Sequence, residues 1–265
     1  MTLKIIVSGP RGRMGKEAIN MILNEENMEL VACIDRINNG KMLADIDGMP
    51  DVHVPIFVDS KQCFESIKAD IFLELSIPDV AFTHTVNALK NGLRAVVGTS
   101  GLTKEQIHDL KILAFEKELG CIIAPNFAIG AVLMMQFAQK AARYFPDIEI
   151  IEKHHDKKLD APSGTAIKTL DMILETREDK EQGHPNEKET LQGARGANQS
   201  GVHIHSVRLP GLIAHQEVIF GGLGQTLTIT HDSYNRQSFM TGVKFALNKV
   251  NELTELVYGM ENILD

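Results

Sequence analysis

The chain has 265 residues, and its 35 acidic and 27 basic side chains give a formal net charge of -8 at pH 7. This length supports two modest domains with their own hydrophobic cores, and the acidic balance argues against a protein that binds nucleic acid. No apolar run reaches the roughly 18 residues of a membrane span, and no basic segment followed by an apolar one opens the chain. Three scattered cysteines without a C-x-x-C pair indicate a reducing compartment. We therefore expect a cytoplasmic protein that does not act on a membrane.

The start of the chain combines a short strand, a glycine-rich turn and a helix. Residues 4–8 form the predicted strand, and the pattern G-x-x-G-x-x-G follows it at Gly9, Gly12 and Gly15. This is the context that a dinucleotide-binding fingerprint requires. Gly9 permits the tight turn, Gly12 lets the backbone approach a pyrophosphate, and Gly15 allows the helix to pack closely on the strand. The predicted cofactor-binding loop comprises Gly9, Pro10, Arg11, Gly12, Arg13 and Met14.

A second predicted strand, residues 30–34, ends at Asp35, about 20 residues beyond the last glycine of the fingerprint. A carboxylate at this position accepts hydrogen bonds from the adenosine ribose of NADH and repels the 2′-phosphate of NADPH. The adjacent Arg36 can bind that phosphate. We therefore predict that the protein uses both NADPH and NADH, with Asp35 and Arg36 as cofactor-binding residues.

Helical and strand patterns then alternate as far as residue 124. The predicted helices are 61–68, 78–91 and 103–119, and the predicted strands are 71–75, 93–97 and 121–124. Thr103 and Gln106 fit a capping box for the third of these helices, and Gly120 is its expected stop. The alternation predicts an α/β fold with a doubly wound parallel sheet, in which ligands bind beyond the carboxyl ends of the strands. The turns at those ends are candidates to line the nicotinamide half of a cofactor: Ser76, Gly98, Thr99, Ser100, Ala124, Pro125, Asn126 and Phe127.

The pattern changes after residue 127. An apolar helix, an alternating strand and a second helix are predicted, followed by a charged stretch at 177–200 that we interpret as a mobile loop and a candidate lid. Three strand patterns and a final helix complete the chain. In order, these predicted elements are 130–144, 147–153, a helix from Gly164, 202–209, 216–220, 225–230 and 233–257.

The segment 154–166 has the sequence H-H-D-K-K-L-D-A-P-S-G-T-A and places acid–base groups directly before a helix start. Ser163 is a candidate N-cap, and the N–H groups at that helix end suit an anion such as a carboxylate. An imidazole has an ordinary pKa of roughly 6.5, and substrate carboxylates nearby would favour its charged form. His154 can then act as a general acid, and Lys158 lies on the same side if the turn is helix-like. The pattern predicts a site that binds a small anion and moves a proton.

These motifs resemble the dihydrodipicolinate reductase family of bacterial lysine biosynthesis over nearly the whole chain. The segment 154–166 matches the family's H-H-x-x-K-x-D-A-P-S-G-T-A without change. The G-R-M-G end of the fingerprint, the A-P-N-F turn and the late S-V-R-L-P-G stand at 12–15, 124–127 and 206–211. Ser100, Ala128 and Gln225 depart from the threonine, serine and glutamate that are common in the family.

The resemblance implies an N-terminal Rossmann domain, residues 1–126, with the C-terminal helix 233–265 packing back on it. It implies a second α+β domain, residues 127–232, whose mixed sheet binds substrate and builds a homotetramer. The implied reaction reduces the dehydrated form of 4-hydroxy-tetrahydrodipicolinate, a cyclic dicarboxylate, to tetrahydrodipicolinate with hydride from nicotinamide C4. His154 and Lys158 would supply the proton. The residues implied to hold the substrate, beside Lys158, are His155, Ser163, Gly164 and Thr165.

Three other functions compete with this interpretation. A zinc enzyme is one, because His203 and His205 alternate on a predicted strand and share a face, although no known metal motif is present and we expect no metal. Another oxidoreductase with a Rossmann domain, acting on a sugar or amino acid, is the second. A non-enzymatic regulator that senses NAD(P) is the third, and it would not need His154, Lys158 and the anion site together.

Overall fold

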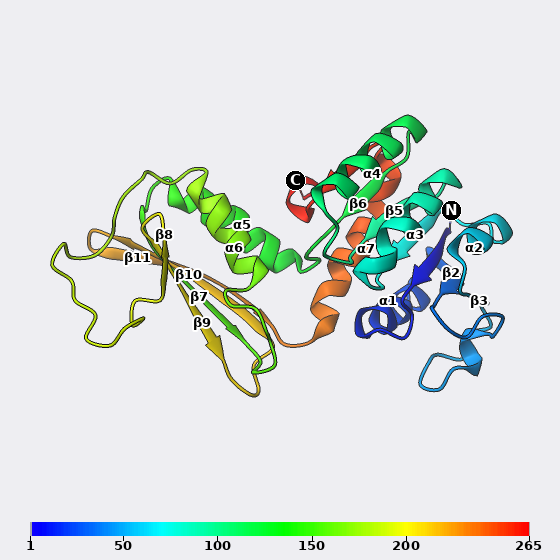
Figure 1. The fold of residues 1–265 in the computed structure, drawn as a ribbon, viewed down its shortest axis with the longest axis horizontal. Helices are drawn as coiled ribbons and strands as arrows, with labels where there is room; N and C mark the ends of the chain where they lie inside the picture. Colours follow the sequence, from blue (N-terminus) through cyan, green and yellow to red (C-terminus); the bar gives the residue numbers. More distant parts are fainter. Residues whose placement is uncertain (1, 265) are drawn as a thin grey trace. The chain divides into compact units, whose positions relative to one another are not determined.

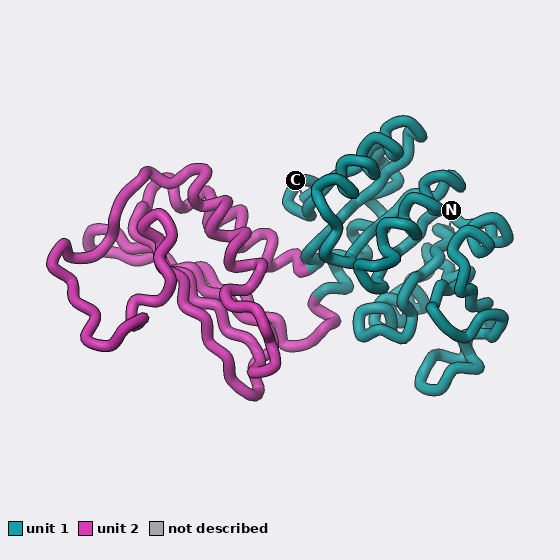
Figure 2. Tube along the Cα trace, in the orientation of Figure 1, with its two compact units in different colours: residues 1–127, 239–265 teal, residues 128–238 magenta. Residues whose placement is uncertain are grey.

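The computed structural model describes residues 2–264, which form two compact units (Figures 1 and 2). Unit 1 comprises residues 1–127 and 239–265, and unit 2 comprises residues 128–238. Each unit has a sheet of its own. Within residues 2–264, no helix combines the length and the apolar character that crossing a bilayer requires.

Unit 1 is built on a seven-stranded sheet with the order β12-β6-β5-β4-β1-β2-β3. Every neighbouring pair in it is parallel. Its strands are β1 (Leu3–Ser8), β2 (Met28–Ile34), β3 (Ile56–Phe57), β4 (Ile71–Glu74), β5 (Arg94–Val97), β6 (Cys121–Ile123) and β12 (Leu256–Tyr258). The prediction of a doubly wound parallel sheet is confirmed. In an all-parallel sheet, helices cover both faces and the buried strands are continuous apolar runs. Strands β1, β4 and β5 have such short apolar runs.

The helices of unit 1 form two groups. Helices α2, α3 and α4 contact one another in succession, and α1 contacts α7. The helices are α1 (Arg13–Leu23), α2 (Ser60–Ser66), α3 (Pro78–Lys90), α4 (Lys104–Lys117) and α7 (Met240–Lys249), with short 3-10 helices at Leu43–Asp45, Val250–Glu252 and Met260–Asn262. Ile6 and Phe72, both fully buried, pack from the sheet against Phe64 of α2 and Ala88 of α3. This core fixes the carboxyl ends of β1 and β4 beside each other.

The predicted helix over 233–257 is wrong at both ends. Strand β11 continues to Ser233, a 3-10 helix covers Arg236–Phe239, and α7 spans only Met240–Lys249. The chain then forms β12, which pairs with β6 at the edge of the sheet. The pairing with β6 makes β12 a strand. Its three residues alone show too little periodicity to be distinguished from the end of a helix.

Helix α4 shows one confirmed and one incorrect end signal. The Thr103–Gln106 capping box is present, with Thr103 Oγ1 accepting from Gln106 N–H at 3.2 Å and Gln106 Oε1 accepting from Thr103 N–H at 2.9 Å. The left-handed cap is Glu118, with φ of 53°, and not Gly120. A Cβ at Gly120 would lie 2.1 Å from the Val250 carbonyl oxygen. Glycine is required there by the close approach of the chain and not by the helix end.

Unit 2 has a five-stranded sheet with the order β11-β10-β7-β9-β8. The pair β7–β9 is parallel and the other pairs are antiparallel, so the sheet is mixed, as predicted. The strands are β7 (Asp147–His154), β8 (Ala197–Gln199), β9 (Val202–Arg208), β10 (Ala214–Gly222) and β11 (Gln225–Ser233), and the helices are α5 (Ile129–Ala142) and α6 (Gly164–Leu174).

Both helices of unit 2 lie on one face of this sheet. Gln216 of β10 reaches Thr169 of α6, and its register partner His231 of β11 lies against Gly130 of α5. Residues that alternate with these point to the opposite face. Ile151 and Glu217, which are register partners on that face, are only half-buried.

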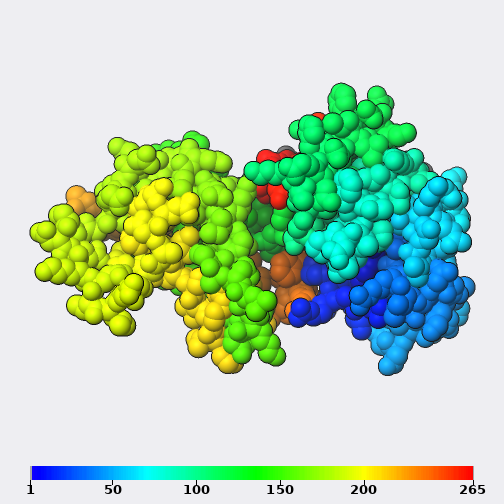
Figure 3. All heavy atoms as spheres, in the orientation of Figure 1, coloured from blue at the N-terminus to red at the C-terminus, as the bar shows by residue number. Residues whose placement is uncertain are grey.

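The segment 177–200, interpreted as a loop, contains the short strand β8 and is fastened at both ends. Arg177 is buried and donates to the carbonyls of Pro146, Ser200 and Lys180 at 2.6, 2.7 and 2.5 Å. Arg195 binds Glu149 at 2.7 Å. Between these anchors the side chains are almost all exposed, and the segment lies on the surface of unit 2 as the yellow-green part of Figure 3.

Candidate functional site

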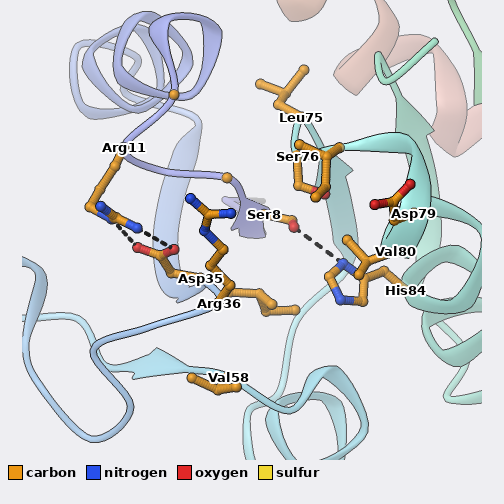
Figure 4. Close-up of a pocket in the computed structure, with 14 residues that line it drawn as sticks. Ser8, Arg11, Asp35, Arg36, Val58, Leu75, Ser76, Asp79, Val80 and His84 are labelled. Atoms are coloured by element: carbon orange, nitrogen blue, oxygen red, sulfur yellow. Dashed lines mark hydrogen bonds and ion pairs between the residues drawn. The ribbon is translucent and has the colours of Figure 1, made fainter. Parts of the chain in front are cut away.

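A cavity of about 600 Å³ lies at the carboxyl ends of β1, β2 and β4 in unit 1 (Figure 4). Five predicted cofactor residues line it: Gly9, Arg11, Gly12, Asp35 and Arg36. The size falls in the range of small-molecule and cofactor sites. Pro10, Arg13 and Met14 belong to the same turn and helix start but are not part of the lining. The position confirms that the fingerprint strand, the Asp35 strand and a third strand converge on one place.

The glycine-rich turn is tightly packed against the chain beyond β4. Gly9 has φ of 77°, and a Cβ there would lie 2.7 Å from the Leu75 carbonyl oxygen and 2.9 Å from Ser76 Cα. A Cβ at Gly15 would lie 2.1 Å from the Gly9 carbonyl oxygen. These two glycines therefore have the roles predicted for them, a tight turn and close packing of α1. At Gly12 the nearest neighbour of a Cβ is 3.2 Å away, so its approach to a pyrophosphate stays a prediction.

Asp35 is buried at the end of β2, and Arg11 occupies both of its carboxylate oxygens through Nε and Nη2 (Figure 4). The hydrogen bond to Asp35 raises the pKa of Arg11. Arg36 is exposed, lines the cavity and makes no hydrogen bond with Asp35. A ribose hydroxyl that reached Asp35 would have to share the carboxylate with Arg11. Arg11 also brings a second positive charge to the place where only Arg36 was expected to bind a 2′-phosphate.

The turns predicted to line the nicotinamide half lie further along the same edge of the sheet. Gly98, Thr99 and Ser100 follow β5, and Ala124 to Phe127 follow β6. Of the predicted turn residues, Ser76 after β4 lines the cavity, and those after β5 and β6 do not. A Cβ at Gly98 would lie 2.5 Å from the Phe127 ring and 2.7 Å from Leu75, so the two turns and the end of β4 are in contact. Their contact with a nicotinamide stays a prediction.

The residues of this cavity fit a nicotinamide dinucleotide. A glycine-rich turn stands at the start of α1, where N–H groups favour phosphate, and a buried carboxylate stands at the end of the next strand. Sequence reasoning missed His84, which lines the cavity, and Glu74, which His84 contacts. Glu74 is a lone acid inside the apolar run of β4, a signal that was available in the sequence.

Unit 2 places His154 at the last position of β7, beside Glu152, which is fully buried. His154 Nδ1 lies 2.5 Å from Glu152 Oε2. A carboxylate can only accept, so Nδ1 carries the proton and Nε2 remains for chemistry. Glu152 was missed in the sequence, although two positions apart on a strand means a shared face.

Arg208 of β9 is the second missed residue, although it stands inside the S-V-R-L-P-G motif. Its Nη1 and Nη2 donate to Glu152 Oε2 and Oε1 at 2.8 and 2.7 Å. Oε1 also accepts a hydrogen bond from the Ser163 N–H at 3.1 Å. Burial alone would raise the pKa of Glu152, but hydrogen bonds from Arg208, Ser206 and His154 lower it below its ordinary value. Glu152 is therefore an anion that ties β7, β9 and the start of α6 together.

The charge state of His154 follows from these neighbours. Burial lowers its pKa, the hydrogen bond and the charge of Glu152 oppose that effect, and the positive charges of Lys158 and Arg208 add to it. The net result is a pKa below the ordinary value of 6.5. At pH 7 the imidazole is neutral, with its proton on the nitrogen that faces Glu152.

The turn after His154 is not helix-like, although a helix-like turn was the condition for placing Lys158 on the same side as His154. Lys158 N–H donates to the His155 carbonyl at 3.2 Å, which closes a turn of four residues. Lys158 Nζ lies 2.7 and 2.9 Å from the two carboxylate oxygens of Asp160. The Asp160 carbonyl accepts from Arg208 at 2.7 Å. Asp160 therefore orders this turn through hydrogen bonds and places the ammonium group of Lys158.

Three of the predicted substrate-binding residues, Ser163, Gly164 and Thr165, form the start of α6. Ser163 is buried and is the N-cap, its Oγ accepting from Ala166 N–H at 3.2 Å, as predicted. Gly164 is exposed, and a Cβ there would meet nothing within 4 Å. Thr165 is half-buried in the first turn. His155 Nδ1 is buried and has no hydrogen-bond partner within residues 2–264. Open space at a helix N-terminus suits an anionic ligand.

The structure gives the two strand histidines other partners. His205 Nε2 lies 2.7 Å from Glu149, and His203 Nδ1 lies 2.7 Å from the Arg195 carbonyl oxygen. Both belong to the opposite face of the sheet from His154, because His203 pairs with Glu149 in the register of β7 and β9. Across the described part of the chain, no group of three or more His, Cys, Asp or Glu residues is arranged to hold a metal ion.

The sequence matches two family models that together cover nearly the whole chain. Residues 3–127 match "Dihydrodipicolinate reductase, N-terminus", and residues 130–264 match "Dihydrodipicolinate reductase, C-terminus". A curated 4-hydroxy-tetrahydrodipicolinate reductase from Geobacillus kaustophilus is 59% identical over 265 residues, which is 100% of both chains. One from Bacillus cereus is 57% identical over 263 residues, 99% of each chain.

Solved structures give the same answer. A dipicolinate-bound dihydrodipicolinate reductase from Paenisporosarcina sp. TG-14 superposes with a TM-score of 0.92 at 58% identity, covering 100% of both chains. The myo-inositol 2-dehydrogenase of Lactobacillus plantarum, at 12% identity and a TM-score of 0.62 over 97% of this chain and 91% of that one, shares the fold alone. The chain therefore belongs to the dihydrodipicolinate reductase family.

Proposed function

We propose that this protein reduces 4-hydroxy-tetrahydrodipicolinate, through its dehydrated form, to tetrahydrodipicolinate with NADPH or NADH. The observation that carries the proposal is the group around Glu152. This buried carboxylate binds His154, Arg208 and the N-cap of α6 together, so an acid–base group and an anion-binding helix start are held beside each other. The relative that contains bound dipicolinate supports a cyclic dicarboxylate as the substrate class.

Unit 1 holds the cofactor in this proposal. The backbone of the turn from Gly9 to Gly12 binds the pyrophosphate. Asp35 binds the adenosine ribose, and Arg36 and Arg11 bind the 2′-phosphate when it is present. Bound NADPH or NADH supplies a hydride from nicotinamide C4. Because Arg11 neutralises Asp35, the site tolerates the 2′-phosphate despite the carboxylate. This supports the use of both cofactors.

His154 protonates the reduced substrate in this proposal. Hydride addition to a conjugated imine leaves negative charge that a proton must neutralise, and Nε2 of His154 is the nitrogen directed away from Glu152. Without substrate the lowered pKa keeps the ring neutral at pH 7. Two substrate carboxylates oppose the effect of Lys158 and Arg208 and favour the imidazolium. Substrate binding thereby converts His154 into a general acid.

Lys158 holds one substrate carboxylate and takes part in the proton relay. Its ammonium group is placed by Asp160 and is about one-fifth exposed, so it can turn toward an anion. The N–H groups at the start of α6, at Gly164 and Thr165, receive the other carboxylate together with Ser163 and His155. A rigid N-cap and a cation on a short turn fit a dicarboxylate better than a neutral sugar.

We also propose that the protein is a homotetramer assembled through the sheet of unit 2. The face of this sheet that lies away from α5 and α6 carries Ile151 and Ile219 among polar side chains, and these isoleucines are only half-buried in one chain. A second copy could cover them. Light scattering should give four times the mass of one chain, and Ile151→Glu with Ile219→Glu should lower it. A monomeric wild-type protein would contradict the assembly.

A cytoplasmic location stays a prediction. Cys33, Cys63 and Cys121 are free and buried, and burial raises the pKa of Cys63 and of Cys121 to about 12. Thiols of this kind persist most readily in a reducing compartment.

The first experiment is the loss of NADPH or NADH absorbance with purified protein. Substrate is made in place from pyruvate and aspartate semialdehyde by the synthase of the preceding step. We expect rapid oxidation that requires every component. Tight cofactor binding without oxidation would leave the cofactor site standing and would shift the function to another substrate or to a sensor of NAD(P).

A further inference from the structure

Glu74 is a buried carboxylate at the carboxyl end of β4, on the edge of the sheet where the cofactor cavity lies. The proposed reaction gives it no role. It is the last residue of β4, between β1 and β5 in the sheet, and it has no exposed surface. A buried carboxylate is retained only where hydrogen bonds compensate its lost hydration. The contacts of Glu74 therefore indicate what holds it there.

Each of these contacts belongs to a different part of the cofactor edge. Oε1 accepts the Ser76 N–H at 2.6 Å and the Thr99 hydroxyl at 3.4 Å. Oε2 lies 2.9 Å from His84 Nδ1. The same Nδ1 is 3.3 Å from Ser8 Oγ at the end of β1, as Figure 4 shows. Glu74 thus connects the turns after β1, β4 and β5 and the side of α3.

These contacts control the shape of the cavity because the turns pack on one another. Gly9 leaves no room for a Cβ against Leu75 and Ser76, so the fingerprint turn rests on the backbone that Glu74 holds through Ser76 N–H. Ser8, Ser76 and His84 all line the cavity. A shift of the turn after β4 would therefore move the wall that Gly9 packs against.

We propose that Glu74 is a positioning residue of the cofactor site, acting through Ser76, Thr99 and His84 to hold the dinucleotide-binding turns in their binding shape. It makes no contact with the cofactor in this role. The inference rests on the proposed use of NADPH and NADH. Since Glu74 lies away from the Asp35–Arg11 pair, its removal weakens both cofactors by the same factor and leaves the choice between them unchanged.

Glu74 also fixes the proton of His84. The carboxylate can only accept, so the neutral imidazole carries its proton on Nδ1 and keeps a lone pair on Nε2. Nε2 has no hydrogen-bond partner within residues 2–264. In Glu74→Gln the amide oxygen can still accept from Ser76, but its NH₂ group then faces His84 Nδ1. That contact favours the other tautomer, with the proton on Nε2 at the cavity wall.

The test measures the dissociation constants of NADPH and NADH directly by their fluorescence, for the wild type and Glu74→Gln. We expect both constants to rise about tenfold or more with an unchanged ratio, while KM for the substrate stays the same. Nitrogen NMR of the histidine side chains should show the tautomer of one residue, His84, change. Glu29→Gln changes an exposed carboxylate on strand β2 of the same sheet; it is the matched control and should change neither constant.

Two outcomes separate this inference from the proposed function. If the wild type binds neither NADPH nor NADH, the cofactor assignment itself fails. If the wild type binds both and folded Glu74→Gln binds them equally well, Glu74 is a structural residue and the inference is wrong. Should Glu74→Gln not fold, Thr99→Val removes one contact of the same carboxylate at the turn after β5. A folded Thr99→Val with unchanged constants for both cofactors would overturn the inference as well.

Discussion

At the scale of single residues, the chemistry of His154 depends on which of its nitrogens Glu152 occupies. Nδ1 faces the carboxylate, so Nε2 is the position from which a proton can leave. Glu152 itself is kept ionised by Arg208, and removing one partner of such a buried pair costs about 3–5 kcal/mol. The neutral imidazole of His154 and the ionised carboxylate of Glu152 therefore depend on each other.

The substitution His154→Gln should slow turnover by about 10²- to 10⁴-fold, the usual contribution of a general acid. Binding of NADPH should be unaffected, because the cofactor residues belong to unit 1. Steady-state kinetics and fluorescence binding measure the two effects. Lys157→Gln, at an exposed position in the same turn, is the control and should keep full turnover. Unchanged turnover in His154→Gln would remove this residue from the mechanism.

A second residue-scale prediction concerns the two arginines near Asp35. Arg36→Ala should weaken NADPH by roughly tenfold or more relative to NADH, because a hydrogen bond to a charged group is worth about 1.5–3 kcal/mol. Arg11→Ala should disfavour NADPH further, since it also leaves the Asp35 carboxylate without its partner. Dissociation constants of both cofactors test this. An equal loss for NADH and NADPH in Arg36→Ala would mean that its assigned role is wrong.

At the scale of elements, the segment 177–200 shows how a charged stretch is held without a core of its own. Arg177 is 7% exposed and has three carbonyl oxygens as partners, which lie at Pro146, Lys180 and Ser200. These bonds hold both ends of the segment beside the start of β7. His154 stands at the other end of the same strand, seven residues on, or roughly 23 Å at 3.3 Å per residue. The anchors therefore lie far from the residue that a lid would cover.

Arg177→Gln should lower the free energy of unfolding by on the order of 3 kcal/mol, because three backbone carbonyls lose a buried, charged donor. Urea unfolding followed by circular dichroism measures the loss. Lys188→Gln, an exposed change on the same segment, should leave the free energy of unfolding within error of the wild type. Turnover of folded Arg177→Gln should stay near that of the wild type, and a large loss would support a lid.

At the scale of the whole molecule, buried ionisable groups predict a loss of stability in acid. The pKa of His154 and that of His231 are lowered from 6.5, chiefly by burial, so the unfolded chain takes up these protons first as the pH falls. In Glu152 and Glu149, burial alone would raise the pKa, but hydrogen bonds outweigh it and lower the pKa from 4.5. Their stabilisation is present above the unfolded value and is lost as the pH falls through the folded values.

The free energy of unfolding should therefore decline below about pH 6.5 and decline more steeply below about pH 4.5. Urea unfolding at a series of pH values measures both slopes. His154→Gln should flatten the first slope, and Glu149→Gln should flatten the second. A wild-type stability that is constant between pH 7 and pH 5 would contradict the assignment of half-buried, neutral histidines.

The sequence predicted the longer elements well and the shortest ones poorly. Strands β1, β2, β7 and β9 have enough alternating or apolar residues to be recognised, and their positions are confirmed within two residues. Strands β3, β8 and β12 have only two or three residues and were missed. Nothing local distinguishes so short a segment from a turn, because its hydrogen-bond partners belong to a neighbouring strand.

The sequence by itself determined the dinucleotide fingerprint, Asp35, the N-cap Ser163 and the segment from His154 to Thr165, because each depends on neighbours within one turn or one helix start. Only the tertiary structure decided the partners that tune them. Glu152 meets Arg208 across 56 positions, and Thr99 meets Glu74 across 25. Such pairs are created by strand order and register, which place side chains from distant segments on one face. For that reason the acid–base group could be found from the chain, but not the buried carboxylates that hold it and the cofactor turns in place.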